Sequence, residues 1–422
     1  MPKLNNFIFQ EIKLNIIYFY QMYKTETFNF ILPEELIAQK PRQDKQETPM
    51  LYWDNGKIVD SKIIDLLDIL RPDDLLIFNK AKVINAKFVA NNLSNNKEIS
   101  FNLDQPKQIN DLTIWQALCK PAKKVESGDI LQISEDFFAK ILAKNQNGFI
   151  ELEFYFANNK NNADFYQSNY QPNNVDIINH QILQAIAKFG NVPLPPYIAT
   201  SEEAVNSYQT IFAKDDFFKD NSAQNSFVDS NFAVAAPTAS LHFTAEIMAK
   251  IEAKGIEIGY LTLNVGAGTF LPVKAEKIED HKMHYEFFEI SEDLANKINK
   301  AKAEKRRIIA VGTTVVRSLE ASANNFKKNR KNIVNSLDSG NSGCGKIVES
   351  FAGNTNIFIY PGYDFLVIDG LITNFHLPKS TLLMLVSAFT GIDEMHKIYT
   401  HAIAKKYQFY SFGDSSLLLK NS

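Results

Sequence analysis

Two patterns of hydrophobic and polar positions divide the chain. From residue 63 to about residue 156, apolar and polar residues alternate in short segments, and turn residues such as Arg71-Pro72 and Asn147-Gly148 separate them. Alternation with a period of two is typical of half-buried strands. The predicted strands are 75–79, 82–90, 98–103, 113–119, 128–134, 137–143 and 149–156. Many short strands without a long helical pattern predict a β-barrel or a sandwich.

The second half of the chain alternates helical and strand patterns. The predicted helices are 243–254, 294–305, 314–323 and 380–389, and the predicted strands are 256–265, 307–311, 357–360 and 365–373. Thr244 is the expected N-cap of the first helix, and Gly255 stands where a helix commonly ends. Such alternation predicts a three-layer α/β domain. The stretches 157–174, 214–231 and 324–346 are polar and aperiodic, so we expect a loop and two surface insertions.

Length and composition narrow the class of protein. A chain of 422 residues is longer than one hydrophobic core usually supports, so two domains are expected. Residues 1–21 lack a basic start and a small-residue cleavage site, and we interpret them as an extension from a mis-assigned start or as a poorly packed terminus. No apolar run reaches the roughly 18 residues that a membrane span requires, which predicts a soluble protein without membrane contact.

Charge and cysteine content exclude further classes. With 45 basic and 48 acidic residues, the net charge is -3, which argues against a protein that coats nucleic acid nonspecifically. Cys119 and Cys344 are far apart and form no CxxC motif, so neither a disulfide framework nor a zinc site is expected. A reducing, cytoplasmic setting fits this usage. Only six residues are arginine, and each retained guanidinium offers a planar fork that lysine cannot replace.

Two glycine turns follow predicted strands. Val-Gly-Ala-Gly-Thr-Phe at 265–270 lets backbone approach a ligand closely, although the motif lacks the third glycine of a dinucleotide fingerprint and an ordinary tight turn explains it equally well. The segment 310–320 reads as a strand, a glycine turn and the start of a helix. Free amides at a helix start, with Arg317 one turn further, suit a carboxylate. A plain threonine N-cap and a solvated arginine are the alternative.

Four of the seven histidines lie in dense motifs and are candidate proton carriers: His242, His281, His284 and His376. For a single histidine, a hydrogen-bonded structural role is the more common explanation. His281, His284 and Glu286 could also form a metal cluster, but no third ligand of the right spacing is evident. We therefore expect no metal.

Together and in this order, these segments resemble the S-adenosylmethionine:tRNA ribosyltransferase-isomerases of queuosine biosynthesis. The matching stretches are 32–38, 74–79, 193–198, 208–210, 235–244, 265–273, 279–284, 309–320, 360–363, 373–389 and 412–414. Coverage runs from about residue 22 to the C-terminus.

The resemblance implies a discontinuous α/β catalytic domain, 22–72 and 161–422, with a small β-barrel domain inserted at 73–160. It also implies a reaction. The ribosyl part of S-adenosylmethionine is moved to 7-aminomethyl-7-deazaguanine at the wobble position of a tRNA with a GUN anticodon, and is rearranged to give epoxyqueuosine, adenine and methionine. S-adenosylmethionine is then a co-substrate, no metal takes part, and the enzyme is expected to be a cytoplasmic monomer.

The implied chemistry needs a base for the ribose C5′ proton and an acid for departing adenine. The expected catalytic residues are His281 and His284 with Glu286, for proton transfer, and His242, for contacts to the adenine or the ribosyl group. The expected S-adenosylmethionine contacts are Gly266, Gly268, Thr269, Gly312, Thr313, Thr314, Arg317 and His376. Lys82 and Lys87 stand where members usually carry arginine, and we expect them to bind RNA. Ser240 replaces a usual glycine, adding a side chain where backbone could need a positive φ.

Two alternatives remain from the sequence. The first is a drifted member of the family that binds tRNA or S-adenosylmethionine without efficient turnover. The second is an S-adenosylmethionine-dependent methyltransferase that uses 265–268 as its cofactor loop. The second is disfavoured because such a loop should follow the first strand of a doubly wound domain, whereas this one lies past the middle of the chain.

Overall fold

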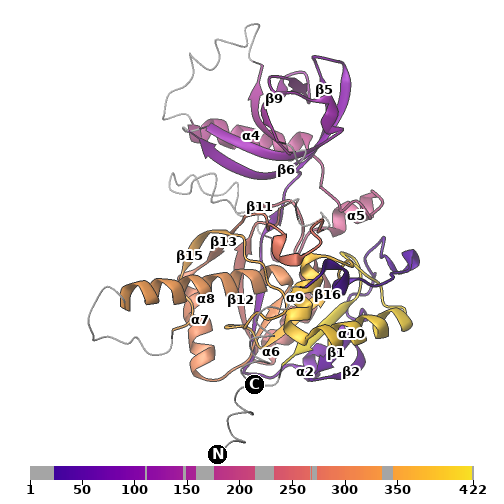
Figure 1. Cartoon of the computed structure of the whole chain (residues 1–422), viewed down its shortest axis with the longest axis vertical. Helices are drawn as coiled ribbons and strands as arrows, with labels where there is room; N and C mark the ends of the chain where they lie inside the picture. Colours follow the sequence, from indigo (N-terminus) through magenta and orange to yellow (C-terminus); the bar gives the residue numbers. More distant parts are fainter. Residues whose placement is uncertain are drawn as a thin grey trace, which may run out of the picture.

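The computed structural model describes residues 23–109, 112–145, 149–157, 175–213, 232–266, 268, 273–334 and 346–420. The segments 1–21 and 214–231, and most of the loop expected at 157–174, lie outside these residues. Figure 1 shows a barrel joined by extended segments to a larger body that contains both described ends of the chain. The predicted combination of an α/β domain and a small β-barrel is confirmed.

One mixed sheet of nine strands forms the centre of the larger body, in the order β15-β13-β12-β3-β14-β16-β17-β1-β2. Its central strands β12, β3, β14 and β16 are mutually parallel, so their carboxyl ends meet at one edge. The strands are β1 Pro49–Asp54, β2 Lys57–Lys62, β3 Leu75–Asn79, β12 Glu257–Leu263, β13 Glu286–Ile290, β14 Ile308–Val311, β15 Phe351–Thr355, β16 Gly370–Asn374 and β17 Ser415–Leu419.

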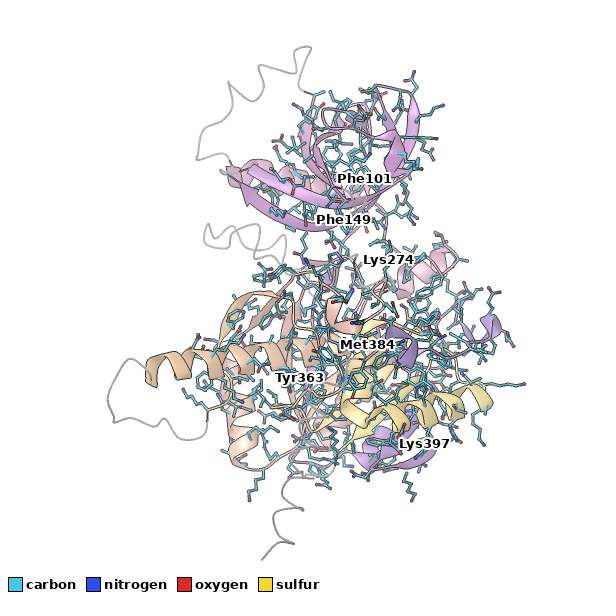
Figure 2. All side chains as sticks on the ribbon, viewed as in Figure 1. Phe101, Phe149, Lys274, Tyr363, Met384 and Lys397 are labelled. Carbon is cyan, nitrogen blue, oxygen red and sulfur yellow. The ribbon has the colours of Figure 1, made fainter. Side chains whose placement is uncertain are left out.

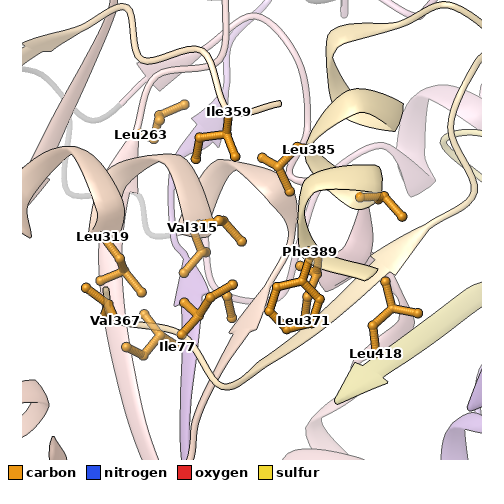
Figure 3. Packing of buried hydrophobic residues seen from close by; sticks show 14 of the residues in the cluster. Ile77, Leu263, Val315, Leu319, Ile359, Val367, Leu371, Leu385, Phe389 and Leu418 are labelled. Atoms are coloured by element: carbon orange, nitrogen blue, oxygen red, sulfur yellow. The ribbon is translucent and has the colours of Figure 1, made fainter. Parts of the chain in front are cut away.

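Helices cover both faces of this sheet, as predicted for three layers. The helices are α2 Leu66–Ile69, α6 Ala245–Ala253, α7 Glu292–Ala303, α8 Thr313–Val334, α9 Thr381–Thr390 and α10 Ile392–Ala404. Alternate strand residues face opposite layers: Ile77 packs with α7, α8 and α9, whereas Phe78 packs with α6 and α2. Figure 3 shows the first layer, where Val315 and Leu319 of α8 meet Ile77.

The barrel closes from six antiparallel strands in the order β10-β7-β6-β5-β8-β9. The strands are β5 Lys87–Asn92, β6 Lys97–Ile109, β7 Leu112–Lys120, β8 Ile130–Gln132, β9 Phe137–Lys144 and β10 Phe149–Phe156. Aromatic rings fill its interior, and Phe88 stacks on Phe101 at 5.2 Å between centroids. Phe101 is labelled in Figure 2. Cys119 is buried in the same core, and burial raises the pKa of its thiol. Cys344 lies outside the described residues.

The barrel does not begin at 73 or end at 160: its first strand is β5, and a helix beyond residue 160 packs into its core. β3 belongs to the large sheet, because it pairs with the parallel strands β12 and β14. All five of its residues are buried. Such a continuous apolar run is typical of a central strand rather than of a barrel strand. Helix α4 Val175–Phe189 instead packs into the barrel core through Ile182 and Ile186. A short parallel pair, β4 Lys82–Val83 and β11 Phe232–Ala233, lies outside both sheets.

The ends of α6 lie where the sequence predicted them. One predicted strand and the predicted end of α8 differ from the structure. Thr244 caps α6 by accepting from Ile247 N, and Gly255 adopts a φ of +83°. The predicted strand at 357–360 is wrong: the edge strand is β15, which starts six residues earlier, and Ile359 packs in the core without strand pairing. α8 continues to Val334, into the predicted insertion. The prediction ended this helix too early because a solvated helix shows no apolar stripe in its sequence.

Short elements connect the longer ones along the described chain. The helix α5 Glu202–Ser207 begins at Ser201, whose side chain accepts from Ala204 N. The 3-10 helices at Thr25–Phe28, Thr238–His242 and Ile278–Asp280 connect longer elements. Within the described ranges, no helix combines the length and the apolar character that crossing a membrane requires.

Candidate functional site

A pocket lies where the carboxyl ends of the parallel strands meet. It encloses about 840 Å³, including space open to solvent. Among the residues that line it, Val265 and Gly312 follow β12 and β14, Asn374 is the last residue of β16, and Glu286 is the first residue of β13. β13 runs antiparallel to β12, so its beginning lies at this same edge. The carboxyl edge of a parallel sheet is the usual place for a ligand site in such folds.

Gly312 turns the chain from β14 into α8. Its φ of +101° is a conformation that residues with a side chain rarely adopt. Thr313 and Thr314 begin the helix at the pocket wall, and the Oγ1 of Thr314 is buried with no hydrogen-bond partner among the described residues. The first amides of a helix lack intrahelical acceptors and favour negative charge. The predicted strand, glycine turn and helix start are therefore confirmed as structure.

Arg317 lies one turn into α8, with 5% of its surface exposed. Its Nη1 donates to Oε2 of Glu286, which is 4% exposed, and Glu286 Oε1 accepts from Gly266 N at 3.0 Å. The Nη2 of Arg317 has no hydrogen-bond partner among the described residues. A buried guanidinium with a spare donor at a pocket wall is suited to an acceptor-rich ligand group.

Much of the remaining pocket wall is aromatic. It is lined by Tyr197, Tyr208, Phe375, Tyr410 and Leu377. His376 also lines it, and its Nε2 lies 2.9 Å from Oγ1 of Thr373. Burial lowers the pKa of His376 to about 3, so the imidazole is neutral near pH 7. Apolar walls with a few fixed polar groups are typical of a small-molecule site.

The glycine turn at 265–268 lies between this pocket and the barrel. A side chain at Gly266 would collide with Oδ1 of Asp104, from barrel strand β6, at 2.6 Å. A side chain at Gly268 would collide with the ring of His284, also at 2.6 Å. The close approach of these neighbours explains both glycines. Thr269 lies outside the described residues.

His281 and His284 lie beside this turn rather than in the pocket. The ring of His284 is exposed and lies 5.7 Å from that of Phe149 on the barrel. Figure 2 labels Phe149 on the side of the barrel that faces the larger body. His281 packs edge-on against Phe358 at 5.5 Å, and burial together with His284 lowers its pKa. The structure does not bring these histidines to Glu286, because that side chain turns toward Arg317.

His242 is separated from the pocket by Asn374. It is 6% exposed in the 3-10 helix Thr238–His242, and its Nε2 lies 3.2 Å from Nδ2 of Asn374. Its other surroundings form a smaller pocket that includes Arg42 and Lys45. Burial, followed by the charges of Lys45 and Arg42, lowers the pKa of His242 to about 3.

The remaining sequence candidates lie near the connection to the barrel or in the same 3-10 helix. Lys82 is in β4 and Lys87 begins β5, and both are half-buried. Ser240 is fully buried within Thr238–His242, a right-handed turn that any residue adopts. Its position therefore does not require glycine for conformational reasons.

Sequence reasoning missed several residues of this region. Asn374 carries no local signal beyond its place in Thr-Asn-Phe-His, and Tyr197 and Tyr410 reach the pocket from segments more than 200 residues apart. Asp104 directly follows the predicted barrel strand 98–103, where a 7% exposed carboxylate is unexpected. Its burial against another domain appears only in three dimensions. Among the residues described, no three His, Cys, Asp or Glu side chains converge as metal ligands would.

Replacement of His242 by glutamine is expected to reduce the acid sensitivity of the fold. His242 has a pKa of about 3 when folded and about 6.5 when unfolded, so the unfolded chain takes up the proton first as pH falls below about 6.5. Between pH 7 and pH 5, the free energy of unfolding of wild type should therefore fall by about 2 kcal/mol more than that of the variant. Urea titrations at both pH values measure this difference, with His180→Gln as the exposed control. Equal losses in wild type and His242→Gln would contradict it.

Comparison with known proteins identifies relatives over nearly the whole chain. The model of the family described as "Queuosine biosynthesis protein" matches residues 25–418. Proteins named S-adenosylmethionine:tRNA ribosyltransferase-isomerase are similar: that of Afipia carboxidovorans is 39% identical and that of Treponema denticola 40% identical. Each comparison covers 94% of this chain and 99% of the relative.

A solved structure is also similar in sequence. The S-adenosylmethionine tRNA ribosyltransferase of Thermotoga maritima is 26% identical, with a TM-score of 0.45, over 93% of this chain and 100% of that one. The family match and the full-length relatives confirm the resemblance found in the sequence. The chain belongs to the queuosine biosynthesis protein family.

Proposed function

We propose that this protein is an S-adenosylmethionine:tRNA ribosyltransferase-isomerase. It transfers the ribosyl part of S-adenosylmethionine to 7-aminomethyl-7-deazaguanine at the wobble position of a tRNA with a GUN anticodon. Rearrangement of the ribose then gives epoxyqueuosine, with release of adenine and methionine. The observation that carries the proposal is the pocket at the carboxyl edge of the sheet, found in a member of this family.

The pocket suits S-adenosylmethionine at both of its ends. Arg317 and the start of α8 offer donors and positive potential to the methionine carboxylate. The aromatic side, with Tyr197, Phe375 and Tyr410, offers faces on which a purine can stack. Glu286 holds both Arg317 and the Gly266 amide, so it positions the carboxylate end rather than moving a proton.

The tRNA base approaches from the barrel side of the glycine turn. There His284, His281 and the barrel surface around Phe149 lie together, outside the pocket proper. These two histidines remain our candidates for proton transfer, and His376 is the candidate that lines the pocket itself. Lys82 and Lys87, at the connection between the two bodies, contact the tRNA backbone in this proposal.

The decisive experiment incubates the protein with S-adenosylmethionine and a GUN-anticodon tRNA that carries the precursor base. Stoichiometric release of adenine and methionine is expected, with incorporation of the ribosyl label into tRNA. Release of S-adenosylhomocysteine would identify a methyltransferase instead. Binding without any product would identify a drifted binding protein, and either result would overturn the proposal.

The histidine assignments are tested in the same assay. Replacement of the proton-transfer residue by glutamine should lower turnover roughly 10²-fold or more while the chain stays folded. Because His281 and His284 differ in burial, they are replaced one at a time, and circular dichroism monitors folding. Near-wild-type rates for His281, His284 and His376 variants alike would remove all three from the chemistry.

A further inference from the structure

The side chain of Asn374 carries one unused acceptor at the wall of the pocket. Asn374 ends β16 and is 2% exposed. Its Oδ1 is buried with no hydrogen-bond partner among the described residues, and Asn374 lines the pocket. A buried polar atom without a partner is costly, so such an atom at a pocket wall indicates a ligand group that pairs with it.

Two neighbours fix which end of the amide faces the pocket. The carbonyl oxygen of Gly413 lies 3.3 Å from Nδ2 of Asn374, and a carbonyl can only accept. Nδ2 must therefore point toward Gly413, which leaves Oδ1 on the other side. The same Nδ2 lies 3.2 Å from Nε2 of His242, so that ring nitrogen accepts as well.

The surroundings of His242 keep this arrangement in place. Acceptance at Nε2 requires the neutral ring with its proton on Nδ1. His242 is buried, and Arg42 and Lys45 line the smaller pocket on its other side, so a further positive charge is disfavoured there. Arg42 is paired with the buried carboxylate of Asp414, at 2.7 Å and 3.0 Å. The imidazole thus acts as a fixed acceptor near pH 7.

We infer that Oδ1 of Asn374 accepts a hydrogen bond from an N–H or O–H group of the S-adenosylmethionine co-substrate, and that His242 is the positioning residue that holds the amide in this orientation. The inference rests on the proposed function and adds to it. The pocket then offers different groups to different parts of the co-substrate. Arg317 offers donors to the methionine carboxylate, and Asn374 offers an acceptor to an N–H or O–H group. His242 takes no part in proton transfer.

Paired substitutions of His242 test the positioning role. His242→Gln keeps an acceptor near the position of Nε2, whereas His242→Leu does not. The leucine variant should raise KM for S-adenosylmethionine roughly 10-fold with less than about 3-fold change in kcat, since one hydrogen bond is lost in binding. The glutamine variant should stay within about 3-fold of wild type, with an unchanged pH profile of kcat. Thermal unfolding confirms that both variants fold.

A double-mutant cycle tests whether His242 acts through Asn374. Asn374→Leu should weaken S-adenosylmethionine binding by roughly 10-fold or more. Adding His242→Leu to it should cause no further loss, because the amide that His242 orients is gone. Independent, multiplying effects would overturn the inference. So would a glutamine variant as impaired as the leucine variant, or one that loses a limb of its pH profile.

Ligand analogues identify the donor group. 5′-Methylthioadenosine, its purine riboside analogue without the amine and its 2′-deoxy analogue are compared in binding to wild type and Asn374→Leu. The analogue that lacks the recognised donor should bind wild type roughly 10-fold more weakly and the variant no more weakly. If Asn374→Leu affects only S-adenosylmethionine itself, the methionine ammonium is the donor. Equal discrimination by both proteins across all ligands would overturn the inference.

Failure of this inference can be told apart from failure of the proposed function. A wild-type protein that releases adenine and methionine, with variants that bind S-adenosylmethionine normally, removes only the role of Asn374 and His242. A wild-type protein that does not bind S-adenosylmethionine at all removes the proposed function, and this inference with it.

Discussion

Replacement of Arg317 by methionine is expected to lower kcat/KM for S-adenosylmethionine by roughly 10²-fold or more, since a preorganised charged donor at the ligand is lost. The same change should lower the free energy of unfolding by roughly 3–5 kcal/mol, because it leaves the carboxylate of Glu286 buried without its cation. Steady-state kinetics and urea denaturation measure the two effects separately.

A double variant separates binding from stability. Arg317→Met combined with Glu286→Gln removes both buried charges, and the glutamine can still accept from Gly266 N. Replacing a buried pair as a unit is often close to neutral, so most of the lost stability should return. Activity should not, because the donor for the ligand is still missing. Recovery of activity in the double variant would show that Arg317 matters only for the fold.

Arg306→Met is the matched control. Arg306 pairs with Glu257 at 2.7 Å in the same body, but it does not line the pocket. Its loss should cost about 1 kcal/mol or less, because the pair is partly exposed, and kcat/KM should not change. Normal turnover by Arg317→Met would contradict the assignment of the pocket.

The retained arginines show what composition could and could not predict. The scarcity of arginine indicated that each one matters, and several hold buried carboxylates: Arg307 makes two contacts with Asp74, and Arg42 makes two with Asp414. The partners are 233 and 372 residues away in sequence. An arginine in the sequence therefore indicates that an acceptor is paired with it. Which carboxylate that is depends on how the strands of the sheet are ordered.

The basic cluster at 300–307 has a structural explanation. Lys302 bonds both oxygens of Asp369, and Arg306 and Arg307 bind Glu257 and Asp74. In a linear sequence the cluster resembles a nucleic-acid contact. In the structure, three of its basic side chains, Lys302, Arg306 and Arg307, are instead paired with carboxylates of the fold.

Local signals predicted the start of α8 well, whereas non-local geometry separates Glu286 from the histidines that precede it in sequence. The turn at Gly312 needs only neighbouring residues, so its sequence is sufficient. His281, His284 and Glu286 are close in sequence, which favoured one catalytic group. The strand β13 begins at Glu286, however, and its first side chain points into the α/β body while the preceding histidines stay at the barrel side. Sequence proximity at a strand boundary does not imply a shared site.

A second large effect is expected from Glu320→Ala, which should lower the free energy of unfolding by roughly 4 kcal/mol or more. Glu320 is fully buried in α8, and burial raises the pKa of its carboxyl. Its oxygens accept from the backbone N–H groups of Leu366, Val367 and Ile368 at 2.9 Å, 3.0 Å and 3.4 Å, and from the hydroxyl of Tyr363. Without the carboxylate, three buried amides lose their acceptor.

Through these amides, Glu320 links α8 to the segment before β16, so its loss should affect both elements together. The segment that Glu320 holds leads directly into β16, whose last residue is Asn374 at the pocket, while the helix that carries Glu320 begins at Thr313, which also lines the pocket. One side chain thus ties together two elements that shape the pocket. Figure 2 labels Tyr363, the hydroxyl partner in this anchor.

The Glu320 series separates a structural anchor from a catalytic group. Glu320→Gln keeps one acceptor oxygen and should lose roughly half as much stability as the alanine variant. Glu292→Ala, an exposed change in the first turn of α7, should lose less than about 1 kcal/mol. The fraction of Glu320→Ala that remains folded, measured by urea denaturation at low temperature, should retain near-normal kcat. A Glu320→Ala protein as stable as wild type would contradict the anchoring role, and if it were also inactive it would assign this carboxylate a part in the reaction.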